Sequence, residues 1–307
     1  MAASAVTVAC VGHTAWDRVF HIAALPPRLR SAKVPALAYR ESGGGMAANA
    51  ACAIAKLGGG ARFIGPAGDD EVAIAMERAL LAAGVDPAGF HRVLKRQSST
   101  SAVIVEADGE RLIVNFRGDA LQAAPTWVNS KLLANCQAVL GDVRWPQGVA
   151  KAFRLARAAG LPTILDADLA VAETYAELLP LTDHAIFSAA GAAAAFPGMP
   201  LKRLPGAVLQ AMLSVKMVAI TLGERGVMWQ VRGTKPAHLP AFSVTAVDTT
   251  GAGDAFHGAY ALALAEGCAV AAALRFASAT AALQCTTVGA RELPARTAVN
   301  RLLKGAT

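Results

Sequence analysis

The sequence predicts an α/β protein whose central, mainly parallel sheet is covered by helices on both faces, with a small antiparallel β lid beside it. Short runs of β-branched residues alternate with longer alanine-rich segments, as in parallel strands joined by helices. The strand-like runs are apolar throughout, which is typical of parallel strands buried on both faces. Two further β-rich stretches interrupt this alternation, and they predict the lid.

The expected elements of the main sheet follow one another in a regular order. Strands are expected at residues 6–12, 61–65, 137–142, 162–168, 184–188 and 217–223. Helices are expected between them, at residues 46–57, 70–83, 147–159, 171–178 and 204–213. The long alanine-rich segment at residues 260–285 predicts a buried helix, because alanine is the strongest helix former.

Two stretches account for the lid. Residues 100–116 contain two β runs joined by a turn at 107–110, whose Asp-Gly pair is a strong hairpin signal. Residues 33–41 also read as extended chain. A third β-rich stretch, 226–244, is expected to form a hairpin at the edge of the main sheet. No repeat or linker divides the chain, so we expect one domain of residues 1–307, with a lid formed by insertions at about 16–41 and 97–118.

The composition favours a compact cytoplasmic protein. Of the 307 residues, 54% are hydrophobic and 17% are charged, which supplies a sizeable core and argues against disorder. The mean hydropathy of +0.41 is high, but Glu266 interrupts the apolar run, and a spanning helix needs roughly 20 nearly uncharged residues. The net charge of +7 is scattered, so neither a membrane nor a nucleic acid is an expected partner. The five cysteines lie far apart and are expected to be free thiols.

The stretch Asp248-Thr-Thr-Gly-Ala-Gly-Asp254 stands directly before the long helical segment. In open α/β sheets, ligands bind beyond the carboxyl ends of the strands, where helices begin. Gly251 and Gly253 would let a ligand approach the main chain, and the amides of residues 251–254 would suit an anion. Asp254 could accept a proton from an incoming hydroxyl, so the stretch suits phosphoryl transfer. By itself it could equally be a tight turn with Asp254 as a helix cap.

Two motifs together resemble the ribokinase-like (PfkB) family of sugar kinases. One is the stretch just described, and the other is Gly44-Gly-Met-Ala-Ala-Asn49, which is similar to the family's N-terminal Gly-Gly-x-x-x-Asn element. Their order and separation also fit, and the resemblance covers essentially the whole chain. It implies a ribokinase-like fold, the use of ATP and Mg²⁺, and Asp254 as the catalytic base. It also implies an anion hole formed by Gly251, Ala252 and Gly253.

The same resemblance implies which residues contact the two substrates. Asp17, which follows the first strand, matches the family aspartate that binds sugar hydroxyls. The sugar pocket would be lined by Gly44, Gly45 and Asn49. The stretch at residues 221–226 resembles a Thr-x-Gly-x-x-Gly element near the nucleotide. It implies ATP contacts from Thr221, Gly223 and Gly226.

Two further implications concern metal ions. Many members carry an Asn-x-x-Glu element linked to magnesium and phosphate, whereas this chain has Ser188-Ala-Ala-Gly191 without the glutamate. Ser188 is therefore the nucleotide-binding candidate at this position, and the metal must be organised differently in detail. Members often also bind a monovalent cation near the C-terminal motif. A site for a cation such as K⁺ is implied at Asp248 and Thr250.

Several stretches resemble the bacterial sulfofructose kinases, which phosphorylate 6-deoxy-6-sulfofructose at its C1 hydroxyl. The most informative is residues 141–145, because this segment is unusual in the wider family. Three side chains could share the oxygens of a sulfonate through charge-assisted hydrogen bonds: Lys33 in an expected lid strand, Asn115 and Arg144. Each also has a simpler explanation, as a solvated lysine, a hairpin cap and an arginine paired with Asp142 or Asp166.

The leading hypothesis is therefore an ATP-dependent kinase of sulfofructose. One alternative is a ribokinase-like kinase of another sugar, such as a ketohexose or a phosphosugar. Another is a non-catalytic sugar or nucleotide sensor, prompted by the missing glutamate. A Rossmann oxidoreductase is disfavoured, because no Gly-x-Gly-x-x-Gly follows the first strand. The lid would have an open edge, which proteins usually cover, so we expect a homodimer that pairs two lids.

Overall fold

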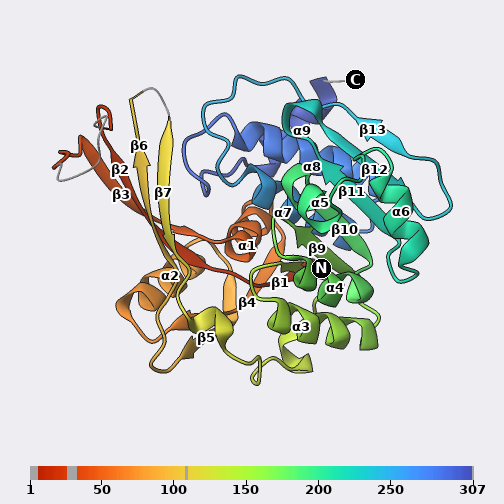
Figure 1. The fold of residues 1–307 in the computed structure, drawn as a ribbon, viewed down its shortest axis with the longest axis horizontal. Helices are drawn as coiled ribbons and strands as arrows, with labels where there is room; N and C mark the ends of the chain where they lie inside the picture. Colours follow the sequence, from red (N-terminus) through yellow and green to blue (C-terminus); the bar gives the residue numbers. More distant parts are fainter. Residues whose placement is uncertain (1–5, 26–32, 108–109, 306–307) are drawn as a thin grey trace, which may run out of the picture.

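The computed structural model describes residues 6–25, 33–107 and 110–305 (Figure 1). The predicted lid segment 26–32 and the centre of the predicted hairpin turn, 108–109, lie outside the described residues. The strands are β1 Thr7–Val11, β2 Ala15–His21, β3 Ala38–Gly44, β4 Gly60–Gly68, β5 Asp86–Val93, β6 Thr100–Val105, β7 Arg111–Phe116, β8 Ala138–Asp142, β9 Thr163–Ala167, β10 His184–Ser188, β11 Met217–Thr221, β12 Val227–Val231 and β13 Ala237–Leu239. The α-helices are α1 Met46–Lys56, α2 Glu71–Ala82, α3 Pro146–Ala158, α4 Ala172–Leu178, α5 Ala189–Ala195, α6 Leu204–Ala211, α7 Ala252–Ala265, α8 Val270–Gln284 and α9 Arg296–Gly305.

The main sheet has nine described strands in the order β13-β12-β11-β10-β9-β8-β1-β4-β5. The strands from β11 to β5 are parallel to their neighbours, and β12 and β13 add an antiparallel hairpin at one edge. All six predicted strands and the predicted edge hairpin are confirmed. The chain runs from β1 through β4 to β5 on one side and returns through β8 on the other, so the order of strands reverses between β1 and β8. Ligand sites form at such a reversal.

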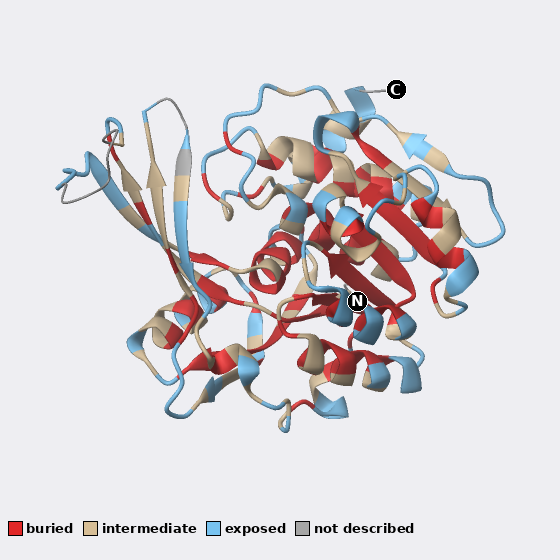
Figure 2. Ribbon diagram, viewed as in Figure 1, coloured by how far each residue is buried: buried red, intermediate tan, exposed pale blue. Residues whose placement is uncertain are grey.

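The main-sheet strands are apolar throughout because each face lies against its own layer of helices. In β1, Val8 and Cys10 belong to a core that includes residues of α1, α7 and α8. Ala9 and Val11, which point the other way, belong to a core with residues of α3 and α6. Figure 2 shows the strands at the centre of the sheet as buried along their length. The continuous apolar pattern is thus a direct consequence of two-sided burial.

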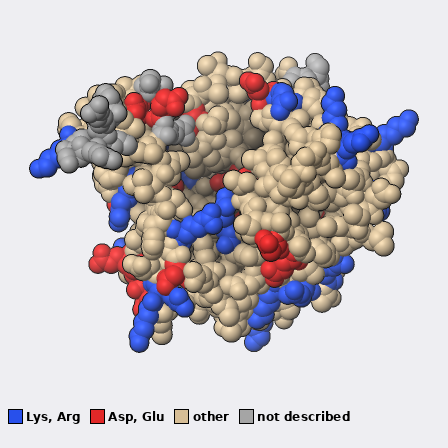
Figure 3. All heavy atoms as spheres, in the orientation of Figure 1, with Lys and Arg blue, Asp and Glu red and all other residues tan. Residues whose placement is uncertain are grey.

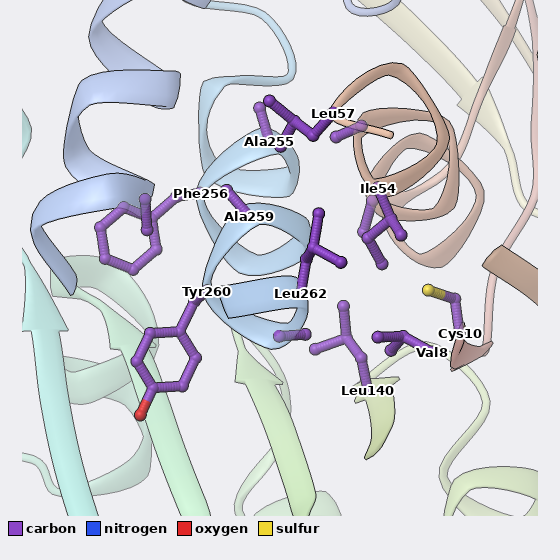
Figure 4. Packing of buried hydrophobic residues seen from close by; sticks show 14 of the residues in the cluster. Val8, Cys10, Ile54, Leu57, Leu140, Ala255, Phe256, Ala259, Tyr260 and Leu262 are labelled. Carbon is purple, nitrogen blue, oxygen red and sulfur yellow. The ribbon is translucent and has the colours of Figure 1, made fainter. Parts of the chain in front are cut away.

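Helices α1 and α7 pack against each other within the buried cluster that Figure 4 shows. A methyl group added at Gly258 would come within 2.5 Å of the Ala50 carbonyl oxygen on α1. Ala255 and Ala259 lie in the same buried cluster as Ile54. The alanine residues of these helices therefore allow the two backbones to approach closely. No helix among the described residues is long and apolar enough to cross a membrane.

Three features of the main domain differ from expectation or were not predicted. The single helix expected at 260–285 is wrong, because α7 ends near Glu266 and Gly267 adopts a left-handed conformation with φ +85°. Such a glycine ends a helix, and α8 then packs back on α7. Strand β5 was not predicted because its Pro and Gly read as a turn, although an edge strand tolerates proline. Helices α5 and α9 were also not predicted.

The lid is the separate four-stranded sheet with the order β3-β2-β6-β7. The predicted hairpin is confirmed as β6 and β7, which pair antiparallel. The pairing register places one polar residue of each strand in a row across the sheet, because Asp17 lies opposite both Ser42 and Ser101, and Ser101 lies opposite Asn115. Strand β3 begins only at Ala38, so the expected placement of Lys33 in a strand is wrong.

Candidate active site

The carboxyl ends of β1 and β8 are joined by the carboxylate of Asp142, which is almost completely buried. Its oxygens accept hydrogen bonds from the backbone N–H groups of His13 at 2.8 Å, Ala47 at 3.0 Å and Arg144 at 2.8 Å. Gly12 precedes His13, and a methyl group on it would lie 2.3 Å from the Asp142 carboxylate. Asp142 therefore holds the end of β1, the start of α1 and the backbone of Arg144 together at the reversal of strand order.

The two sequence motifs meet at this point. Gly251 has the left-handed conformation, with φ 75°, and stands as the N-cap of α7. Asp254 follows in the first turn of that helix, and its Oδ2 accepts a hydrogen bond of 2.8 Å from Nδ2 of Asn49. Asn49 lies near the start of α1, which begins after Gly45 with φ 93°. Residues 205 positions apart are thus brought into direct contact.

The environment of Asp254 suits a group that exchanges protons near neutral pH. Burial raises the pKa of Asp254 to about 7, and the Asp166 and Asp142 carboxylates act in the same direction. The hydrogen bond from Asn49 and the neighbouring His257 lower the pKa but do not cancel the effect of burial. His257 is itself buried, with its Nε2 atom 3.3 Å from Oδ1 of Asp166 and its Nδ1 atom 2.7 Å from the carbonyl oxygen of Gly253.

A cavity of about 250 Å³ lies over Asp254. Figure 3 shows a hollow between the lid and the main body, with basic side chains gathered beside it. The residues that line the cavity are His13, Gly45, Met46, Asn115, Arg117, Leu121, Arg144, Asp168 and Asp254. Two arginines and two carboxylates therefore face the same partly open space, which can hold a small anion beside a proton acceptor.

The cavity also explains the state of His13. Burial and, to a smaller extent, the positive charges of Arg144 and Arg117 lower the pKa of His13 to about 3. The imidazole is therefore neutral at pH 7, and its Nε2 atom lies 2.8 Å from Oγ of Ser99. The only full positive charges among the residues lining this cavity come from the two arginines.

Of the three side chains predicted for a sulfonate, two line the cavity. Arg144 is there, with Nη1 donating to the Leu169 carbonyl oxygen at 2.9 Å and Nη2 to Oδ2 of Asp168 at 3.2 Å. Asn115 is there too, and its Nδ2 donates to Oγ of Ser101 at 3.0 Å. Lys33 is exposed and does not line this cavity. Arg117 was not predicted from the sequence. It could have been identified as a basic residue directly after the second strand of the predicted hairpin.

Asp17 lines a second cavity, of about 180 Å³, between the lid and the loops at 247–250 and 288–290. Burial raises the pKa of Asp17, while a hydrogen bond with Ser101 and the charge of Arg291 oppose this. Gly44 has no side chain at the place where a methyl group would lie 2.3 Å from the Asp17 carboxylate. Gly44 is therefore required for Asp17 to occupy its position.

The residues predicted for the nucleotide lie at the ends of neighbouring strands. Thr221 ends β11, and Gly223 follows it with φ +61° and no neighbouring atom within 4 Å of a potential Cβ. Gly226 has φ +85°, and a Cβ there would lie 2.0 Å from the Leu239 carbonyl oxygen. Packing against β13 thus already accounts for Gly226. Ser188 caps α5, accepting from Gly191 N–H at 2.9 Å and donating to Oδ1 of Asp168 at 2.8 Å.

Asp248 joins the two loops predicted to bind a monovalent cation. Its Oδ1 accepts from the N–H of Thr250 at 2.8 Å, and its Oδ2 accepts from the N–H of Gly289 at 2.9 Å. Among the described residues, no three His, Cys, Asp or Glu side chains converge as a metal site. Mg²⁺ usually binds through one or two carboxylates together with substrate phosphates, and Asp168 is a carboxylate on the cavity wall suited to that arrangement.

The chain is similar to known proteins in both sequence and fold. The sequence model of the pfkB family of carbohydrate kinases matches residues 6–298. An ATP-dependent ribose-1-phosphate kinase of Halopiger xanaduensis is 30% identical over 97% of this chain and 98% of that protein. The crystal structure of a putative ribokinase from Agrobacterium tumefaciens is 34% identical, with a TM-score of 0.92 over 99% of both chains. Arabidopsis thaliana ribokinase, complexed with ribose and ATP, has a TM-score of 0.82 and 26% identity over 98% of this chain and 99% of that one.

Proposed function

Because this chain belongs to the pfkB family of carbohydrate kinases, we propose that it transfers the γ-phosphoryl group of ATP to the C1 hydroxyl of 6-deoxy-6-sulfofructose. The family consists of carbohydrate kinases, which phosphorylate sugars. Our specific proposal is that the sugar is a sulfosugar. The observation that carries it is the single cavity that holds Arg117, Arg144 and Asn115 together with Asp254. A substrate with an anionic group at one end and a hydroxyl at the other could contact the arginines with the first and Asp254 with the second.

The proposed reaction is a direct displacement. Asp254 accepts the proton of the C1 hydroxyl as its oxygen attacks the γ-phosphorus, and the bond to the bridging oxygen of ATP breaks, so that ADP leaves with the electron pair. The amides of residues 251–254 at the start of α7 stabilise the negative charge on the transferring group. Mg²⁺, bound with the nucleotide, would neutralise phosphate charge. Asp17 and Asn49 would orient the sugar, and Thr221, Gly223 and Ser188 are proposed to lie beside the nucleotide.

The structure changes one part of the proposed sulfonate site. Since Lys33 lies outside the cavity, we assign the second cation to Arg117 and keep Arg144 and Asn115. The guanidinium group presents several donors in one plane, which suits an oxyanion with three oxygens. A phosphate has the same shape and charge sign. The main alternative is therefore a phosphosugar, which the ribose-1-phosphate kinase among the relatives also suggests.

A panel of sugars decides between these substrates. We expect kcat/KM, measured by ATP turnover, to be highest for 6-deoxy-6-sulfofructose, compared with fructose 6-phosphate, ribose 1-phosphate, fructose and ribose. Arg117→Met and Arg144→Met should each lower kcat/KM on the sulfosugar by about 10- to 100-fold, as for the loss of a hydrogen bond to a charged group. They should have little effect on kcat/KM for fructose, because fructose has no anionic group for these arginines to bind.

The matched control is Arg154→Met, which removes an exposed arginine on α3 with the same change in net charge. Equal or better kcat/KM on fructose 6-phosphate, fructose or ribose would reject the sulfosugar. Equal losses on charged and neutral sugars would reject Arg117 and Arg144 as an anion site. If no sugar causes ATP consumption, the alternative of a non-catalytic sugar or nucleotide sensor would be favoured.

We also propose that the protein is a homodimer in which two lids pair. On the lid face opposite Asp17, Tyr39 and Val114 are 52% and 60% exposed. Phe20, Ile104 and Leu112 lie in register with Tyr39 on that face. A second lid would remove this apolar surface from water. We expect light scattering to report a dimer at micromolar concentration, and Val114→Lys to weaken it; a wild-type monomer would overturn the proposal.

We also retain the proposal that a monovalent cation such as K⁺ binds beside Asp248 and Thr250. The support is the Asp248 carboxylate, which holds the loops at 248–250 and 289 together beside the start of α7. Backbone carbonyl groups of these loops would supply most of the ligands. Titrating kcat with KCl at constant ionic strength tests the site, and a rate independent of K⁺ would contradict it.

A further inference from the structure

The side-chain amide of Asn49 is held between a carboxylate and a guanidinium group. Its Nδ2 donates to Oδ2 of Asp254 at 2.8 Å, and its Oδ1 accepts from Nε of Arg291 at 2.9 Å. Asn49 is buried, and Arg291 is partly buried. Arg291 lies 242 residues away in sequence, in the loop that precedes α9. Neither motif that led to the site contains it.

We propose that Arg291 is a positioning residue, which fixes the Asn49 amide so that its N–H group faces Asp254. This proposal rests on the proposed role of Asp254 as the general base. The reasoning depends only on hydrogen-bond chemistry. Arginine has donors and no acceptor, so it can face only the oxygen of the amide. An ionised aspartate has acceptors and no donor, so it requires the nitrogen. A rotated amide would place donor against donor and acceptor against acceptor.

The guanidinium group is itself held by the end of the lid. Nη2 of Arg291 donates to the Gly44 carbonyl oxygen at 3.2 Å. A methyl group on Gly43 would lie 1.9 Å from Nη1, so the group occupies the space that a side chain at position 43 would take. Arg291 therefore contacts β3 of the lid and α1 of the main domain at once. Because the neighbouring lid strand β2 carries Asp17, the same contact also fixes the base of the proposed sugar-binding face.

The expected consequence concerns the proton affinity of Asp254. Asn49 stabilises the ionised carboxylate, whereas burial, Asp166 and Asp142 favour the protonated form, and His257 opposes them. Other charged or titratable groups on the cavity wall are His13, Arg117, Arg144 and Asp168. Without Arg291 the amide can rotate, and the Asp254 carboxylate loses the hydrogen bond from Nδ2 of Asn49, which favours its ionised form. The pKa of Asp254 should then rise.

A double-mutant cycle tests this route. We expect Arg291→Met and Asn49→Ala each to lower kcat at pH 7 about tenfold and to shift the acidic limb of the pH–rate profile upward. The double variant should lose no more than Asn49→Ala alone, because residues that act through one another are not additive. Losses that multiply would show that Arg291 acts independently of Asn49 and would overturn the proposal.

Two further variants separate positioning from general damage. Arg291→Lys keeps a donor for Oδ1 of Asn49. Compared with Arg291→Met, it should have a higher kcat and an acidic limb closer to that of the wild type. Gly43→Ala leaves Arg291 in place but displaces its guanidinium group, so it should reproduce the limb shift of Arg291→Met. The control is Arg301→Met, an exposed arginine on α9, which should match wild type. Failure of Gly43→Ala to move the limb would count against the proposal.

A measurement without turnover distinguishes this proposal from the proposed reaction. The Asp254 carboxyl carbon can be followed by ¹³C NMR against pH in the unliganded protein and assigned with Asp254→Asn. We expect its pKa to be higher in Arg291→Met than in the wild type. An unchanged pKa would refute the positioning role even if the kinase is active. A raised pKa would support it even if every sugar tested proves inert.

Discussion

Asp254→Asn should lower kcat by about 10³-fold, because a positioned general base contributes between 10² and 10⁴. Asparagine has the same shape and can still accept the hydrogen bond from Nδ2 of Asn49, but it cannot take the proton of the sugar hydroxyl. Sugar affinity, measured by calorimetry, should be largely retained. Turnover within tenfold of wild type would show that another group accepts the proton.

The pH dependence of the wild type provides a second test of the same residue. A general base must be ionised to act, and burial raises the pKa of Asp254 to about 7. The kcat of the wild type should therefore fall as the pH drops below 7, about tenfold for each unit. The residual kcat of Asp254→Asn should lack this acidic limb. An identical limb in both proteins would assign it to a different group.

Protein stability supplies the control for this variant. A carboxyl group whose pKa is raised by folding begins to destabilise the folded state once the pH exceeds its pKa in the unfolded chain. The destabilisation reaches its full size above the pKa in the folded protein. A neutral amide removes that destabilisation. Asp254→Asn should therefore have a Tm at pH 8 equal to or above that of wild type. A clearly lower Tm would mean that the loss of kcat reports misfolding rather than catalysis.

Gly253→Ala should lower kcat/KM for ATP by about 10²-fold, comparable to the loss of one donor in an oxyanion hole, without lowering stability. Gly253 is exposed in the first turn of α7, and apart from its chain neighbours and the adjacent backbone of its own helix, no described atom lies within 4 Å of where its Cβ would be. Alanine is also a better helix former than glycine, by about 1 kcal/mol. Packing within the protein therefore does not require a glycine at position 253. A ligand that approaches the main chain would require one.

The contrast with Gly251 sharpens this test. Gly251 has φ 75°, and a Cβ there would lie 2.8 Å from Cβ of Ala290. Gly251→Ala should therefore lower both Tm and activity, whereas Gly253→Ala should lower activity alone. Full activity of Gly253→Ala, with its Tm unchanged or raised, would show that the transferring phosphoryl group does not pass this position.

Much of the fold followed from local pattern. The six strands at 6–12, 61–65, 137–142, 162–168, 184–188 and 217–223 were predicted because burial on both faces leaves a continuous apolar run, which needs no knowledge of the partners. The hairpin of β6 and β7 was predicted from its turn. Prediction failed where a single residue changed the outcome, as at Gly267, which divides the expected helix, and in β5, where edge position made proline acceptable.

The sequence by itself determined the α/β architecture, the family, and the two motifs that contain Asp254 and Asn49. These depend on residue type and spacing over a few turns of chain. Only the tertiary structure decided that Arg117 rather than Lys33 joins Arg144 at the cavity, and that Arg291 holds Asn49. The reason is that a charged residue in a loop carries no periodic signal. Its role depends on which distant groups packing brings within hydrogen-bonding distance.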